Sequence, residues 1–160
     1  MSNILNEQLL EDMFIKAYYD KFEEDLKNKK YDTLIKFLDE IRTKLCSFVP
    51  NRPDLHNNIF ETIDTTFIES MLRNDAMDNN YIFNLIQYII NQLKEFDSLE
   101  NERNYEMWKT MTCEQLQNNV DICILLPKFF REVFFRLDSL EESINDFKNS
   151  NIYKNLVSNK

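Results

Sequence analysis

The 160-residue chain contains no glycine. Glycine is the residue that adopts positive φ angles at little cost, and the glycine-rich loops that cradle phosphates depend on it. This absence excludes P-loop and Rossmann nucleotide-binding proteins, and hydrolases built on the G-x-S-x-G elbow. The single histidine further excludes metal sites that need a histidine pair, such as H-E-x-x-H proteases and the standard di-iron bundle.

Positive charge is also scarce: the chain has 19 lysines and arginines and 28 aspartates and glutamates, which gives a formal net charge of −9. Nucleic acids and anionic membranes are bound through a basic face, so neither is expected as a partner. We expect no membrane span, and we expect Cys46, Cys113 and Cys123 to be structural thiols, since none forms a C-x-x-C pair. The expected location is the reducing cytoplasm. The many asparagines, isoleucines and lysines accompany AT-rich coding sequence, as in protozoa or large DNA viruses.

The apolar residues that are present recur at helical rather than alternating spacing. We expect a single all-α domain over residues 1–160, an irregular bundle of about seven to nine helices. The helix over 81–96 is expected to be the central and most buried one, because apolar residues cover more than half of its circumference. Before it we expect helices over 3–27 and over 32–48, the latter with Asp32 as N-cap, and two short helices, one capped by Asp54 and one capped by Asp64 or Thr65. After it we expect helices over 99–111, from Thr112 through Ile124, and from Pro127 to 147. Residues 148–160 are expected to form a short helix or a frayed tail.

Few residues have the chemistry of a catalytic or metal site. His56 would act as a general base only if Asp54 or Glu61 oriented its ring, and a solvated histidine on a short helix is the simpler interpretation. The acidic groups lack the alternating ligands and glycine turn of a calcium loop, so we interpret them as solvated helix faces. Cys113 and Cys123 are expected on one helix, about 15 Å apart, where they cannot form a disulfide. We therefore predict no catalytic, cofactor-binding or metal-binding residue, and no cofactor.

Two segments carry more apolar side chains than one buried face requires. The first helix is apolar around nearly its whole circumference, which is typical of a helix that is buried on several sides, broken, or shared with a partner. The segment 129–135 holds four phenylalanines, and Phe135 points away from the apolar stripe of its helix. Three interpretations of Phe135 are open: an isolated exposed residue, a residue of a helix buried on both sides, or part of a surface that binds a partner. The candidate interface consists of Phe14, Tyr18, Phe130, Phe134 and Phe135.

The stretch from residue 31 to 96 contains several motifs in a fixed order. A helix with the pattern L-x-E-I-R-x-K-L begins at Leu38, a proline-bearing connection follows, and D-x-x-F-I begins at Asp64. The sequence D-A-M-D then begins at Asp75 and precedes an apolar helix. This order resembles the T-complex protein 11 family, which usually has glycine where this chain has Asp75. The helix over 129–147 resembles a later family helix, with Asn145 in the place of a family asparagine, so the resemblance covers about 31–147.

The resemblance implies a role but no catalytic site. Members of the T-complex protein 11 family are associated with cAMP and protein kinase A signalling, and the chain resembles a minimal or truncated member. The resemblance implies a non-catalytic, helical regulatory or interaction domain, in which a second copy or another protein covers the first helix and the helix that carries Phe135. One alternative is a small-molecule-binding protein or enzyme with an inter-helix pocket lined by tyrosine, arginine and carboxylate groups. Another is a structural subunit of a larger particle.

Overall fold

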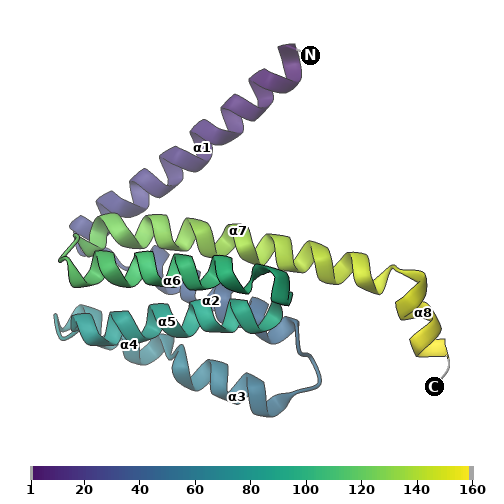
Figure 1. Cartoon of the computed structure of the whole chain (residues 1–160). Coiled ribbons are helices and arrows are strands. Elements are labelled where there is room, and N and C mark those ends of the chain that lie inside the picture. The colour runs from purple at the N-terminus through teal and green to yellow at the C-terminus, as the bar shows by residue number, and fades with distance from the viewer. Residues whose placement is uncertain (1, 159–160) are drawn as a thin grey trace.

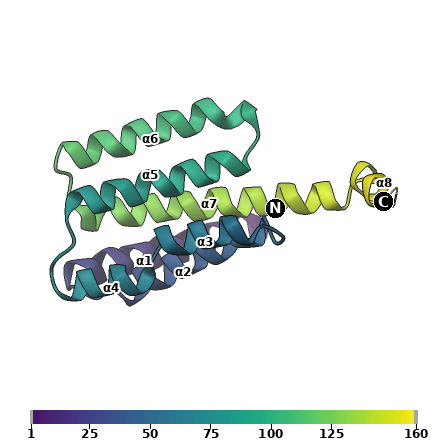
Figure 2. The same ribbon diagram turned by 90° about the horizontal axis from the view of Figure 1, so that it is seen from below.

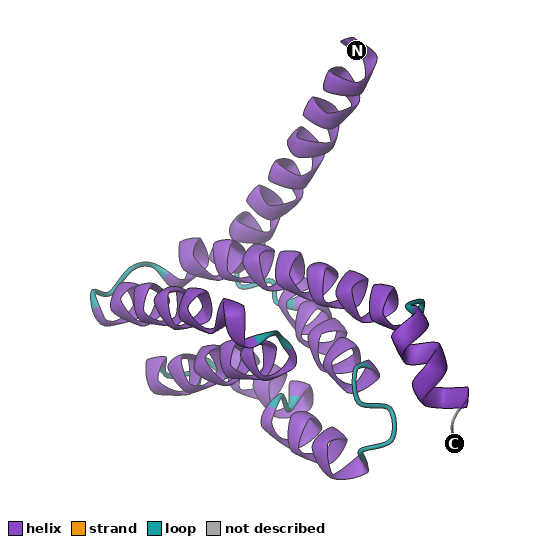
Figure 3. Ribbon diagram, turned by 45° about the vertical axis from the view of Figure 1, so that its right-hand side comes forward, coloured by secondary structure: helices purple, strands orange, loops and turns teal. Residues whose placement is uncertain are grey.

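The computed structural model describes residues 2–158, and within this range the chain forms eight α-helices, one 3-10 helix and no strand (Figures 1 and 3). This confirms the predicted all-α, multi-helix bundle. In chain order the elements are α1 (Ser2–Lys27), α2 (Asp32–Ser47), α3 (Pro53–Thr62), α4 (Thr65–Arg73), α5 (Asn79–Phe96), the 3-10 helix η1 (Leu99–Asn101), α6 (Glu102–Gln117), α7 (Ile122–Lys148) and α8 (Asn151–Ser158).

Helix α7 is the centre of the bundle, and the prediction that the helix over 81–96 is the central one was wrong. Helix α7 contacts α1, α2, α5, α6 and α8. Eight of its residues are buried, against four in α5. Figure 2 shows α5 and α6 on one side of α7, with α2, α3 and α4 on the other. The apolar pattern of a sequence shows how much of a helix's circumference is apolar. It does not show how many neighbouring helices cover that surface.

Helix α1 is anchored to the bundle only at its C-terminal end. Phe22 and Leu26 are buried, whereas every residue from Asn3 to Tyr18 is exposed. This exposed stretch, which we call the apolar arm, is about 24 Å long at 1.5 Å per residue. Figures 1 and 3 show the arm leaving the bundle at an angle to α7. Helix α8 projects from the far end of α7 and corresponds to the short helix expected after residue 148, whereas residues 159–160 lie outside the described range.

The turn between α6 and α7 differs from its prediction. Thr112 opens no helix, because its hydroxyl donates a hydrogen bond to the carbonyl of Trp108, 2.8 Å away, inside α6. The chain turns instead at Asn119, whose φ is 59°, and Asp121 caps α7 by accepting a hydrogen bond from the N–H of Cys123. Pro127 therefore lies inside α7 rather than in its first turn. The prediction treated proline as a start signal and overlooked the ability of asparagine to adopt positive φ.

The predicted helix starts were correct in one case and displaced in two. Asp64 caps α4 as predicted, by accepting a hydrogen bond from the N–H of Phe67 at 3.0 Å. Asp32 is instead the first residue of α2, which has no side-chain cap. Helix α3 is opened by Pro53, while the Asp54 carboxylate accepts two hydrogen bonds from the Arg52 side chain. Proline at the first helical position has no N–H, so it removes one of the unpaired donors of the first turn.

Candidate interaction surface

The apolar arm exposes large hydrophobic side chains on every side of the helix. With 3.6 residues per turn, Leu9, Phe14 and Ile15 face three different directions. A contiguous apolar surface of this kind on a folded chain is typical of a site that another molecule covers. Since no side of the arm is wholly polar, such a molecule must contact it along more than one side. The exposed hydrophobic residues of the arm are Ile4, Leu5, Leu9, Leu10, Met13, Phe14, Ile15 and Tyr18.

An aromatic cluster holds the root of the arm. The ring of Phe37, on α2, lies at its centre, 5.0 Å between centroids from Phe22 of α1 and 5.0 Å from Phe134 of α7. Phe130 of α7 is 5.6 Å from Phe37, and Tyr18, the last residue of the arm, is 6.1 Å from it. Aromatic pairs at such separations contribute about 0.5–1.5 kcal/mol each beyond the area they bury. The cluster fixes the direction of the arm and joins its surface to that of α2 and α7.

An open groove between α2 and α7 begins at this cluster. Ile35, Phe134 and Leu137 contribute the apolar part of its lining. The charged residues of the lining are five carboxylates, Asp32, Asp39, Glu40, Asp138 and Glu141, and two lysines, Lys36 and Lys44. Lys44 is already paired with Glu141 across the groove. The groove therefore combines an apolar floor with an excess of negative charge.

The five predicted interface residues fall into three environments. Phe14 and Phe135 are exposed, at 74% and 67% of their surface, and Tyr18 is about half exposed. Phe134 is half-buried in the aromatic cluster and borders the groove. Phe130 is only 2% exposed, so its place in this candidate interface is corrected: its ring fills the core between Phe22, Phe37 and Phe129. A run of adjacent phenylalanines spreads around a helix, so its members cannot all face one surface.

Phe135 lies on a different side of α7 from Phe134. It lies one helical turn beyond Arg131, and residues four apart share a helix face. The guanidinium of Arg131 lies over the ring of Tyr19, 5.9 Å from its centroid. Phe14, Tyr18 and Phe135 thus remain as exposed members of the predicted interface.

The sequence interpretation missed Phe37. The apolar stripe assigned to its helix ran through Leu34, Leu38, Ile41, Leu45 and Phe48. The first four are buried as expected, and Phe48 is half-buried. Phe37 lies three residues after Leu34 and is 4% exposed. A wider stripe that took both the i+3 and the i+4 neighbour of Leu34 would have included it. Its role in joining three helices depends on tertiary structure that the sequence does not display.

His56 has a structural role at the end of α2. Its Nε2 atom lies 2.7 Å from the carbonyl oxygen of Val49 and 3.1 Å from that of Cys46. Of the two carboxylates expected to orient it, Asp54 and Glu61, Asp54 is bound instead by Arg52, whose hydrogen bonds lower the pKa of Asp54 to about 2. Both carbonyls also accept a backbone N–H, Cys46 from Val49 and Val49 from Arg52, so the imidazole adds a second hydrogen bond to the turn that follows α2. The arrangement contains no base–carboxylate pair.

Arg42, the central residue of the family-like motif, is also engaged within the fold. Its Nη2 lies 2.7 Å from Asp39 Oδ1, and the contact is an ion pair without hydrogen-bond geometry, since this oxygen accepts no hydrogen bond among the described residues. Nη1 donates to the carbonyl of Ile63 at 3.3 Å, and the guanidinium lies 4.4 Å from the centre of the Phe60 ring. Arg42 thereby ties α2 to the end of α3.

A buried polar network joins α5, α6 and α7. The hydroxyl of Tyr105, a residue only 1% exposed, donates to Asp97 Oδ2 at 2.6 Å. Burial and the Asp97 carboxylate raise the Tyr105 pKa, so the phenol stays protonated. Arg136 lies 4.5 Å from the Tyr105 ring centre and 4.4 Å from that of Trp108, and it donates to Glu132 at 2.8 Å. Arg136 is thus ion-paired with Glu132, and Asp97 accepts hydrogen bonds from Tyr105, Asn101 and the N–H of Ser98, as expected of a structural network.

Within residues 2–158 no helix is long and apolar enough to cross a membrane, and no group of three histidine, cysteine or acidic side chains is placed to hold a metal ion. Cys46, Cys113 and Cys123 are free. Cys113 lies on α6 and Cys123 on α7, so the expectation that they share one helix was wrong, because the turn at Asn119 separates them.

Comparison with known protein families gives one match. The family model described as T-complex protein 11 matches residues 6–98, which is more than half of the 160-residue chain. The matched range includes most of the apolar arm and ends after α5. It therefore begins earlier than the resemblance seen in the sequence and does not reach the helix over 129–147. Searches of curated proteins and of solved structures gave no match.

Proposed function

The chain belongs to the T-complex protein 11 family, and we propose that it is a non-catalytic, helical protein-interaction domain whose binding element is the apolar arm. The observation that carries this proposal is the set of eight large hydrophobic side chains on the arm. All eight are exposed, and together they surround the helix. The proposed partner is a protein that supplies an amphipathic helix with lysine or arginine beside its apolar stripe.

Charge complementarity favours such a partner over a second copy of the chain. The arm carries three carboxylates, Glu7, Glu11 and Asp12, against the single Lys16. The groove between α2 and α7 adds five carboxylates against two lysines. Two of the five, Asp39 and Asp32, are paired with arginines outside the lining, and the remaining three still outnumber the lysines. Two copies would bring surfaces of the same sign together, and like charges across an interface oppose association. A basic helix would be attracted to both surfaces.

The geometry at the root of the arm supports binding across both surfaces. Tyr18 of the arm and Phe134 of the groove contact the same Phe37 ring, so one apolar surface continues from arm to groove. A partner helix lying in the groove would place its apolar stripe on Ile35 and Leu137. Its basic flanks would then lie beside Glu40 and Asp138. Helix-in-groove recognition of this type uses apolar anchors spaced three to four residues apart.

The family resemblance extends the proposal to cAMP and protein kinase A signalling as the pathway of the partner. Family membership is the support for this part. Binding assays with purified regulatory and catalytic subunits of protein kinase A test it directly. Failure to bind either subunit would remove this pathway and leave the interaction role standing.

The interaction role is tested with a synthetic 18-residue helical peptide that carries leucines at heptad a and d positions and lysines beside them. We expect fluorescence anisotropy to show saturable binding that weakens as salt is raised, because the charges are exposed. The same peptide with glutamates in place of the lysines serves as the control and should not bind. Hydrogen exchange adds a second readout, since amides of the unsupported arm should exchange fast in the free protein and slow on binding.

Three variants locate the binding surface. Phe14→Asp and Phe135→Asp should each weaken binding about tenfold or more, as expected of aromatic anchors. Leu99→Asp alters a side chain that is 86% exposed on η1 and should leave binding unchanged. The proposal is overturned if all three variants bind as the wild type does while remaining folded. A dimer of the wild-type chain in sedimentation velocity, dissociated by Phe14→Asp, would replace the basic partner with a second copy.

A further inference from the structure

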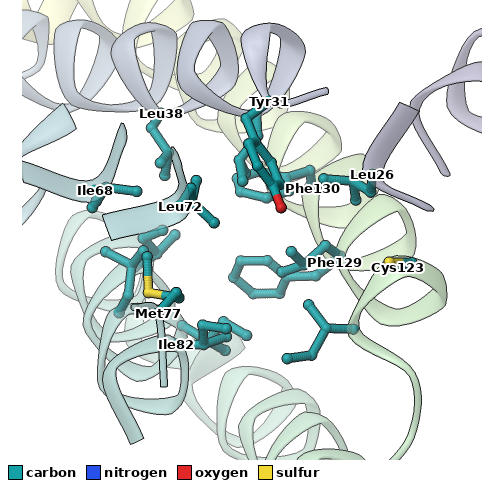
Figure 4. Close-up of a pocket in the computed structure, with 16 residues that line it drawn as sticks. Leu26, Tyr31, Leu38, Ile68, Leu72, Met77, Ile82, Cys123, Phe129 and Phe130 are labelled. Carbon is teal, nitrogen blue, oxygen red and sulfur yellow. The ribbon is translucent and has the colours of Figure 1, made fainter. Parts of the chain in front are cut away.

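The core contains a cavity of about 190 Å³ at one end of the bundle (Figure 4). Its lining comes from both sides of the α1–α2 turn, both sides of the α4–α5 turn, and the start of α7. Leu38, Ile86 and Phe129 form part of its inner wall and are at most 3% exposed. Tyr31 and Leu72 are half-buried in the same lining, so the cavity opens toward the turns.

The lining is almost entirely hydrocarbon. The hydroxyl of Tyr31 and the sulfurs of Cys123 and Met77 are its only side-chain heteroatoms among the 16 lining residues. Burial raises the pKa of the Cys123 thiol, and the neighbouring Asp121 raises it further, so the sulfur stays uncharged at neutral pH. Figure 4 shows the Tyr31 oxygen directed toward the open space between the labelled side chains. A charged group has no partner inside this cavity, whereas an apolar group is surrounded by contacts.

The size of the cavity sets the size of its ligand. Natural protein cores contain few voids larger than a water molecule, so a void of about 190 Å³ departs from ordinary packing. An apolar cavity of about 150 Å³ is large enough to bind benzene, which has six carbons. Scaled in proportion, the present cavity has room for about seven or eight carbons. Ordinary repacking of the lining side chains has not filled this space.

The mouth of the cavity carries groups suited to a polar head. Lys29, in the α1–α2 turn, pairs with Asp75, in the α4–α5 turn, at 3.4 Å, and both side chains are exposed. Tyr31 follows Lys29 by two residues and presents its hydroxyl at the cavity. We propose that the cavity binds the hydrocarbon tail of a small amphiphile, an acyl or alkyl chain of about eight carbons, with its polar head at the mouth beside Tyr31 and Lys29. This site is separate from the apolar arm and from the groove between α2 and α7.

The methionine methyl groups report on this binding without a label on the ligand. In a chain labelled with carbon-13 at its methionine methyls, 1-octanol or octanoate should shift the Met77 signal saturably. Met13 on the arm and Met107 on α6 are exposed and lie outside the lining, so their signals should not move with it. Tighter binding of octanoate would show that Lys29 contributes to the head-group site, and equal binding of both probes would show that the tail and a hydroxyl suffice.

Matched variants separate cavity binding from adsorption to exposed apolar surface. Leu72→Phe enlarges a lining side chain and should abolish the Met77 response, while Leu116→Phe makes the same change in a half-buried residue outside the lining and should preserve it. Leu85→Phe is a second lining variant for use if circular dichroism shows Leu72→Phe to be unfolded. Phe14→Asp should retain octanol binding even where it loses peptide binding. An unmoved Met77 signal up to the solubility limit, a response that survives in the folded lining variants, or a Met13 shift with the same dependence would each overturn the proposal.

Discussion

Truncation of Phe22 to alanine tests whether the arm is held to the bundle only at its root. Phe22 is 1% exposed, and its ring lies 5.0 Å from Phe37 and 6.1 Å from Phe130. Removing a buried phenylalanine side chain costs about 3–5 kcal/mol, through lost burial and the cavity left behind. With an m-value of about 2 kcal/mol/M, this cost lowers the urea midpoint by about 1.5–2.5 M.

The matched truncation, Phe14→Ala, removes the same atoms from a side chain that is 74% exposed. Its expected effect is within about 0.5 kcal/mol, because a surface side chain without partners contributes little to the free energy of unfolding. Both variants are measured by urea unfolding, followed by circular dichroism at several protein concentrations. If Phe14→Ala costs as much as Phe22→Ala at every concentration, the arm packs on its own bundle and our reasoning is refuted. If that cost grows with concentration, the arm is buried between copies of the chain.

Two further predictions concern the polar network and the α4–α5 turn. Tyr105→Phe should cost about 1.5–3 kcal/mol at neutral pH, because it deletes a buried hydrogen bond to the Asp97 carboxylate. Burial acts to raise the Asp97 pKa, but hydrogen bonds, first among them that of Tyr105, outweigh it and leave the pKa lowered. The stabilisation is therefore present at pH 7 and fades as pH falls through the folded-state pKa of Asp97. An equal cost in urea unfolding at pH 7 and at a pH below the folded-state pKa of Asp97 would contradict this. Asp75→Gly should stabilise the chain by up to about 1 kcal/mol, since Asp75 has a φ of 52°, where glycine is not strained. Asp78→Gly is the matched control and should destabilise the chain, because it removes the N-cap of α5 at a φ of −99°. Thermal melts of the two variants check this, and shifts of the same sign would contradict it.

The helices themselves could be predicted from the sequence because helical periodicity is local information. Ile41, Leu45 and Ile90 belonged to predicted apolar stripes, and each is 0% exposed. The break after α2 was equally clear, since Pro50 cannot continue a helix and restricts the residue before it. The α6–α7 turn could not be located in this way. Asn119 adopts the left-handed conformation there, and neither proline nor glycine marks the position in the sequence.

The candidate surface could be predicted only in part, because exposure depends on which helices meet. The all-round apolar character of the first helix left burial, breakage and a shared interface open, and the structure leaves this part of the helix uncovered by the rest of the chain. Phe130 and Phe135 are five residues apart in one helix, yet one is 2% and the other 67% exposed. The difference arises from the approach of α1 and α2 to one side of α7, which no local pattern encodes.

Because the chain has no glycine, the turns around the cavity place residues that carry a side chain at positive φ. The residues with positive φ in the described part of the chain are Lys29, Asp75 and Asn119, one in each of the three turns beside the cavity. A left-handed conformation costs a residue with a Cβ atom roughly 1–2 kcal/mol, and asparagine and aspartate tolerate it better than lysine does. The family glycine expected at position 75 suits such a turn at no steric cost, but it has no side chain. Aspartate keeps the turn and adds the carboxylate that pairs with Lys29 at the cavity mouth, so the replacement exchanges backbone freedom for a polar contact between two turns.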